Sequence, residues 1–126
     1  MNRELSAAEK AVVEKIIRHA PPSMPEITTV STKQRDYLIQ LLPFLRVTGT
    51  CGCGNCPSVY LHPVGEWPEP VDTCDCVLDS WTEVDPAMVM LFIENGLPTF
   101  LEVAPFGDFS VPLPDADALR FDFTQL

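Results

Sequence analysis

The chain has 126 residues, 46% of them hydrophobic, which indicates one globular domain and excludes a disordered chain. Its net charge of −10 is uneven: residues 1–46 hold seven basic residues against five acids, whereas residues 47–126 hold thirteen acids and one basic residue. A field of that sign excludes direct binding to nucleic acid or to an anionic membrane, and it favours a basic protein partner. The simpler alternative is that the charge only keeps the protein soluble.

The chain shows no targeting or membrane segment that we can identify. Its longest apolar run, residues 87–93, is far below the ~20 residues that span a bilayer. The first six residues are polar and lack the apolar region of a secretory signal. We therefore expect a cytoplasmic protein.

The first third of the chain carries two helix signals. A capping box at residues 6–9 (Ser-Ala-Ala-Glu) precedes apolar residues at helical spacing, which predicts a first helix over residues 7–19. A second box at residues 31–34 (Ser-Thr-Lys-Gln) begins another helix, and Pro43 predicts that it ends near Leu42.

Strand signals follow the helices. Residues 44–48 and 58–62 are expected to be extended, and residues 76–84 alternate imperfectly between apolar and acidic. The clearest signal is a hairpin of residues 88–94 and 97–103 around an Asn-Gly turn, in which Pro98 predicts an irregular start or an edge position for the second strand.

This order predicts an α+β fold, with two N-terminal helices followed by a small antiparallel sheet of three to five strands. We expect a single domain over residues 1–126. Within it, residues 1–43 form the helical part, residues 44–110 the cysteine turn and the sheet, and residues 111–126 a tail that wraps the surface.

All five cysteines lie between residues 51 and 76, in the pattern C-x-C-x2-C followed by C-x-C. Cys53 and Cys56 form a C-x2-C knuckle on a glycine-rich turn, and Cys74 and Cys76 are two residues apart, so that they would share one face of a strand. This spacing predicts a structural zinc site with these four cysteines as ligands. Cys51 and His62 are alternative ligands.

Three other states of the cysteines remain open at this stage. They are unliganded thiols on a glycine turn, a disulfide pair and a redox site. An odd number of cysteines without an export signal disfavours disulfides in a reducing compartment. A thioredoxin-type motif requires its C-x-x-C to begin a helix, whereas here Pro57 and an expected strand follow the motif.

Residues 46–59 (RVTGTCGCGNCPSV) resemble the centre of a group of small uncharacterised bacterial proteins, frequent in actinobacteria, with a V-x-G-x-C-x-C-G-C-P-[ST]-V core. Later segments, residues 91–103 and 112–119, match the same group. The resemblance implies a small α+β domain and no established activity. The chain departs from the group by inserting Asn55 and by adding Cys74 and Cys76.

The sequence contains no G-x-S-x-G elbow, P-loop, dinucleotide-binding fingerprint or H-E-x-x-H motif. The leading functional hypothesis is therefore a small acidic binding or inhibitor module, not an enzyme, that carries a structural metal and acts on a basic protein. The alternative is a zinc- or thiol-dependent enzyme that uses the region of Cys51 and His62. A third possibility is an accessory subunit that docks through Phe106, Phe109, Phe121 and Phe123.

Overall fold

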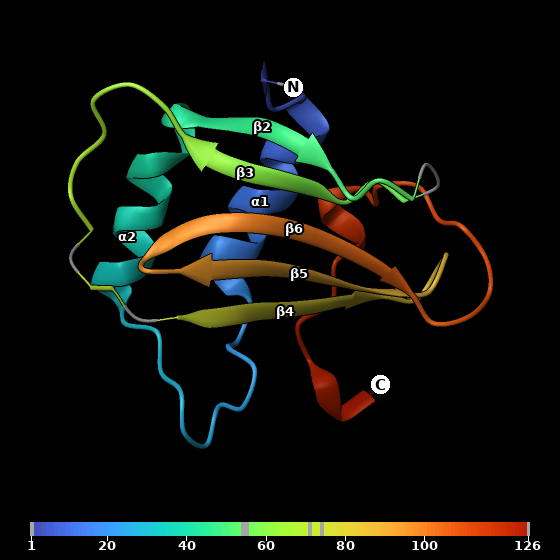
Figure 1. The fold of residues 1–126 in the computed structure, drawn as a ribbon. Coiled ribbons are helices and arrows are strands. Elements are labelled where there is room, and N and C mark those ends of the chain that lie inside the picture. The colour runs from blue at the N-terminus through green and yellow to red at the C-terminus, as the bar shows by residue number, and fades with distance from the viewer. Residues whose placement is uncertain (1, 54–55, 71, 74, 126) are drawn as a thin grey trace.

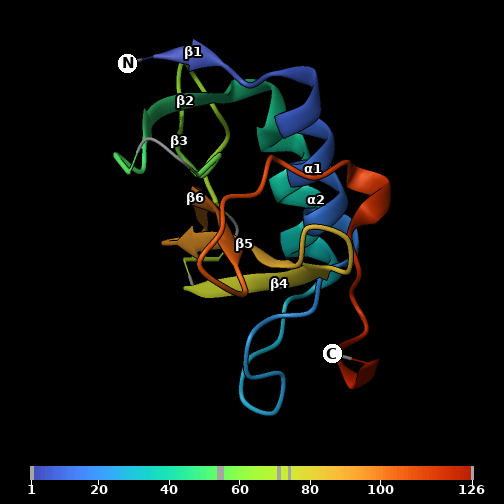
Figure 2. The ribbon, with the colours of Figure 1, turned by 90° about the vertical axis from the view of Figure 1, so that its right-hand side faces the viewer.

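The computed structural model describes residues 2–53, 56–70, 72–73 and 75–125. Figures 1 and 2 show a twisted antiparallel sheet with both α helices packed on one of its faces, which is an α+β fold. In chain order the elements are β1 (Arg3–Glu4), α1 (Ala7–His19), α2 (Thr32–Leu41), the 3-10 turn η1 (Leu42–Phe44), β2 (Leu45–Thr50), β3 (Val59–Pro63), β4 (Cys76–Thr82), β5 (Ala87–Glu94), β6 (Leu97–Pro105), η2 (Ala116–Ala118) and η3 (Phe123–Gln125).

The prediction of two N-terminal helices followed by three to five strands is wrong in two respects. Within the described residues the sheet has six strands, and the first of them, β1, precedes α1. β1 is only two polar residues long, so it has no alternating pattern that sequence analysis can detect. It forms because Arg3 and Glu4 pair with β2, and the guanidinium of Arg3 donates two hydrogen bonds of 2.8 and 2.9 Å to the carboxylate of Glu9.

Both predicted capping boxes are confirmed. In α1 the Ser6 hydroxyl accepts the amide of Glu9, and the Glu9 carboxylate accepts the amide of Ser6. Ser31 and Gln34 make the equivalent pair in α2. α2 ends at Leu41 and continues into η1, as the proline at position 43 predicts.

The sheet has the strand order β1-β2-β3-β6-β5-β4, and every described pairing is antiparallel. The predicted Asn-Gly hairpin joins β5 to β6, and the pairing is irregular where Pro98 faces Ile93, as expected. β6 lies inside the sheet between β3 and β5, so of the two predicted alternatives the irregular start holds and the edge position does not.

The core lies between the sheet and the helices. Val12, Val13, Ile16 and Ile17 of α1 are fully buried, as are the inward-facing residues of the strands.

Residues 111–125 pass behind the sheet, where η2 lies beside α1 (Figures 1 and 2) and Asp117 is 3.7 Å from the Lys15 ammonium. Leu119 is buried and Phe121 packs against the core, whereas Phe106 and Phe109 are about half exposed. Among the described residues, no helix has the length and apolar character that crossing a membrane requires.

Candidate metal site

The cysteine turn connects β2 to β3, which are hydrogen-bonded neighbours in the sheet. Thr50 pairs with Val59, so the turn is closed at its base by the sheet itself. Gly52 has φ +85°, a conformation that side chains rarely adopt, and it reverses the chain immediately after Cys51. The sheet and this glycine together bring residues 51, 53 and 56 to one place.

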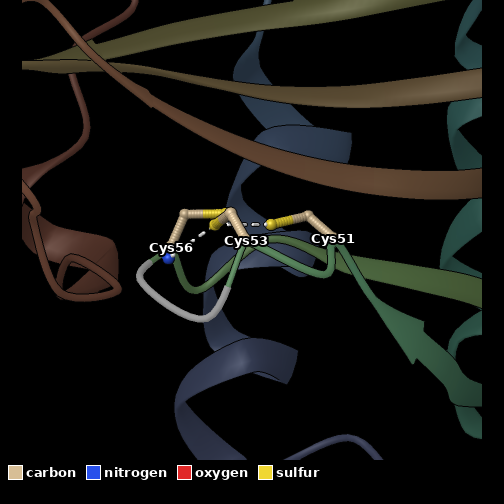
Figure 3. Close-up of side chains that lie close together, drawn as sticks. All are labelled: Cys51, Cys53 and Cys56. Carbon is tan, nitrogen blue, oxygen red and sulfur yellow. Dashed lines mark hydrogen bonds between the residues drawn. The ribbon is translucent and has the colours of Figure 1, made fainter.

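Figure 3 shows that the thiols of Cys51, Cys53 and Cys56 point toward one another. The sulfur of Cys53 is 3.0 Å from that of Cys51 and 3.2 Å from that of Cys56, and the amide of Cys56 donates a 3.2 Å hydrogen bond to the Cys53 sulfur. All three sulfur atoms lie within 4.8 Å of one another. The separations exceed the about 2.05 Å of a disulfide bond, so the three residues are neighbouring thiols.

This arrangement is close to that required by a tetrahedral thiolate site. Zinc–sulfur bonds of about 2.3 Å place ligand sulfurs about 3.8 Å apart. The cysteine sulfurs therefore need to move by less than about 1 Å to accept such an ion. Cys53 is exposed and the other two are half-buried, so an ion can reach the site from solvent.

The neighbouring thiols affect the protonation of Cys51. Hydrogen bonding with Cys53, and to a lesser degree with Cys56, raises the pKa of Cys51 to about 11. Cys51 is therefore a protonated thiol near neutral pH, which is the opposite of the activated thiolate that a nucleophilic or redox cysteine needs. A metal ion that binds here has to displace protons.

The structure separates the residues predicted as ligands. Cys53 and Cys56 lie together, and Cys51, an alternative in the prediction, completes the group. Cys74 lies outside the described residues. Cys76 begins β4 opposite Ile93, at the end of the sheet where β6 begins, whereas the cysteine turn lies where β6 ends (Figure 1). Through Ile93, Cys76 is level with Pro98 of β6, whereas Val59 at the base of the turn is level with Leu101, about 10 Å further along the strand at about 3.3 Å per residue. Two strands, β5 and β6, also lie between β4 and β3.

His62 is also remote from the turn. It lies three residues beyond Val59 on β3, about 10 Å along the strand and away from Cys51. Its exposed ring is hydrogen-bonded through Nδ1 to the carbonyl oxygen of Pro63 at 2.7 Å and meets Trp67 edge to face. The structure therefore does not bring His62 to the three thiols.

Proximity along the chain, rather than a match to a four-cysteine pattern, was the useful sequence signal. Three cysteines within six residues that include Gly52 and Gly54 have little freedom to separate once the sheet closes the turn. Cys76 is separated from this turn by the whole of β3 and a long loop, and its position depends on the pairing of β4 with β5.

Comparison with known proteins found no matching family model, no matching curated protein and no matching solved structure. The chemistry of the turn is therefore the basis for assigning a role. Three cysteine sulfurs form a donor set for a thiophilic ion such as Zn²⁺. A fourth coordination position remains for water or for a group from outside the turn.

Proposed function

We propose that this protein is a small acidic binding module, not an enzyme, in which Cys51, Cys53 and Cys56 hold a zinc ion and the acidic surface engages a basic protein. The observation that carries the proposal is the group of three sulfur atoms within 4.8 Å of one another. We assign zinc because it binds thiolate ligands in a tetrahedral arrangement and is not redox-active.

The role of the ion is structural. The turn between β2 and β3 is long for a hairpin connection, and glycine at positions 52 and 54 gives its backbone many alternatives in the unfolded chain. An ion bound to three points of the turn removes much of that freedom, and its binding energy adds to the stability of the folded state.

The acidic half of the chain supports the second part of the proposal. Residues 47–126 contribute thirteen acids and only Arg120 as a basic residue. Arg120 pairs with Glu83 at 3.6 Å, and Lys15 from the other half pairs with Asp117, both at the surface. The excess negative charge produces a field that attracts basic proteins and accelerates their association at low salt.

Titration of the reduced protein with Co²⁺ and then with Zn²⁺ tests the metal site, because thiolate ligands give cobalt a charge-transfer absorption. We expect one ion per chain and protection of three thiols from alkylation. Cys51→Ser, Cys53→Ser and Cys56→Ser should each weaken binding by more than about tenfold. Cys76→Ser is the matched control and should bind like the wild type.

Two results would count against the proposed ligands. Absence of stoichiometric binding would remove the metal from the function. A loss of affinity in Cys76→Ser as large as that in Cys53→Ser would instead identify the four-cysteine set predicted from the sequence, and would exclude a site confined to the turn.

A further inference from the structure

One face of the sheet is left open by the helices. Figure 2 shows α1 and α2 on a single side of the strands, and in the described part of the chain no helix lies on the other. β5 illustrates the division, since Val89 and Leu91 face the helices and are fully buried, while the alternating residues of the strand are half-buried or exposed. We define the open face by the following outward and accessible residues of four strands: Tyr60, Val77, Met88, Met90, Phe92, Glu94, Phe100 and Glu102.

A continuous apolar row crosses this face. Tyr60, Phe100 and Phe92 are partners in the registers of β3, β6 and β5, and their ring centroids are 4.5 and 5.9 Å apart. Val77 of β4 extends the row at one end. At the other end Tyr60 lies beside Gly49 of β2, where a Cβ atom would be 3.5 Å from the tyrosine ring.

The apolar row is accessible and of the composition that protein interfaces favour. The Tyr60 side chain is 47% exposed. Phe92 and Phe100 are half-buried, and each ring covers part of the other. Met88 and Met90 continue the apolar surface toward the far end of β5. Aromatic residues and methionine are enriched at interfaces because they bury large areas and adapt their packing to a partner.

Carboxylates lie on both sides of the row. Glu102 is the register partner of Met90, two residues along from the aromatic row and about 7 Å away from it. Glu94 lies two residues from Phe92 in the opposite direction along β5 and is exposed. A ligand that covers the aromatic row therefore meets negative charge at both of its edges.

We propose that the open face is the surface that engages the basic partner, and that it binds an amphipathic basic segment of another protein. Apolar side chains of the segment pack on Tyr60, Phe100 and Phe92, and its lysine or arginine side chains lie against the flanking carboxylates. This inference rests on the proposed function for the sign of the partner's charge, and it adds the place where the partner binds.

The charge decides between this occupant and a second copy of the chain. Two copies stacked through their open faces would bring together like carboxylates, and each copy carries a net charge of −10. Like charges at an interface oppose association, whereas a basic segment neutralises them. The apolar row alone would suit both occupants, and its acidic borders favour the basic segment.

Two short synthetic amphipathic peptides that share their Leu and Phe positions test the proposal. One has Lys and the other Glu at every polar position. Binding to the ¹⁵N-labelled protein is followed by backbone NMR shifts at about 0.05 and 0.5 M salt. We expect the Lys peptide to bind more tightly at low salt, with its largest shifts on the outward residues of β3, β5 and β6.

Variants locate the binding on the face. Tyr60→Ser should weaken binding of the Lys peptide by about tenfold. Glu102→Gln should weaken it by about fivefold and reduce its salt dependence. The matched control is Glu69→Gln, which removes the same charge from an exposed loop, and it should change the affinity by less than about twofold. The NMR spectrum of each variant verifies that it is folded.

The possible failures are distinguishable. Tight binding of the Lys peptide with shifts elsewhere, and with wild-type affinity in Tyr60→Ser, would overturn the open face as the site while leaving a basic partner in place. Equal or absent binding of the two peptides would overturn both. A salt-stabilised dimer of the chain alone that Tyr60→Ser abolishes would make a second copy the occupant, and would also refute the inference.

Discussion

Replacing Gly96 with alanine is expected to destabilise the protein far more than the same replacement of Gly65, although both glycines have the same backbone conformation. Their φ angles are +79° and +86°. Gly96 follows Asn95 in the turn between β5 and β6, and a Cβ atom there would overlap the carbonyl oxygen of Asp72 and lie 2.9 Å from the Cβ of Pro70. At Gly65 nothing lies within 4 Å of the added atom.

The two substitutions therefore share one energetic term and differ in another. A side chain in the left-handed region costs about 1–2 kcal/mol, which is the whole expected effect at Gly65. At Gly96 the methyl group must also displace backbone of the segment that covers the hairpin, and overpacking of this kind adds about 1–3 kcal/mol. We expect losses of about 2–5 kcal/mol for Gly96→Ala and about 1–2 kcal/mol for Gly65→Ala.

Urea denaturation followed by the fluorescence of Trp67 and Trp81 measures both free energies of unfolding. A domain of this size has about 5–15 kcal/mol of stability, so a folded baseline should remain for both variants. Equal losses in the two variants would refute the reasoning, because they would show that residues 70 and 72 do not press on the turn and that only the backbone conformation matters.

Four further changes have expected outcomes. Glu9→Gln should lower the free energy of unfolding by about 1 kcal/mol at pH 7, and this loss should shrink as the pH falls below 4.5. The reason is that the hydrogen bonds from Arg3 hold the pKa of Glu9 below its ordinary 4.5, and the stability they add is lost when the folded protein takes up the proton; equal urea midpoints at pH 7 would contradict this. Arg35→Ala should cost about 2 kcal/mol in urea denaturation, because the guanidinium donates bonds of 2.9 and 2.8 Å to carbonyl oxygens at the end of α1, and lysine at this position should restore only part of the loss. Asp79→Asn should raise the melting temperature at pH 7 but not near pH 3, because burial raises the pKa of this carboxyl above its ordinary 3.8 and its charge therefore opposes folding; a lower melting temperature at pH 7 would exclude that explanation. Zinc at about 100 times its dissociation constant should stabilise the wild type by about 2.7 kcal/mol and leave Cys53→Ser unchanged, as measured by urea denaturation.

The part of the candidate site that could be predicted is the part held by short-range geometry. Cys53 and Cys56 were recognised from a C-x2-C spacing, and Cys51 lies beside them because a glycine turn closed by two paired strands leaves three nearby cysteines little room to separate. Cys76 was assigned to the same site on spacing alone. Its actual position follows from the pairing of β4 with β5, a long-range choice that no local pattern encodes.

Features whose stabilising contacts lie within a few residues are encoded locally in the sequence. The two capping boxes join residues three apart, and the turn at Asn95 and Gly96 needs two residues with positive φ, so both could be recognised locally. Local patterns do not encode the strand order, the addition of β1 to the sheet or the alignment of Tyr60, Phe100 and Phe92 across the open face. These depend on register between segments distant in the chain, where a shift of one residue would turn every side chain to the other face, so the packing of the whole core selects among the alternatives.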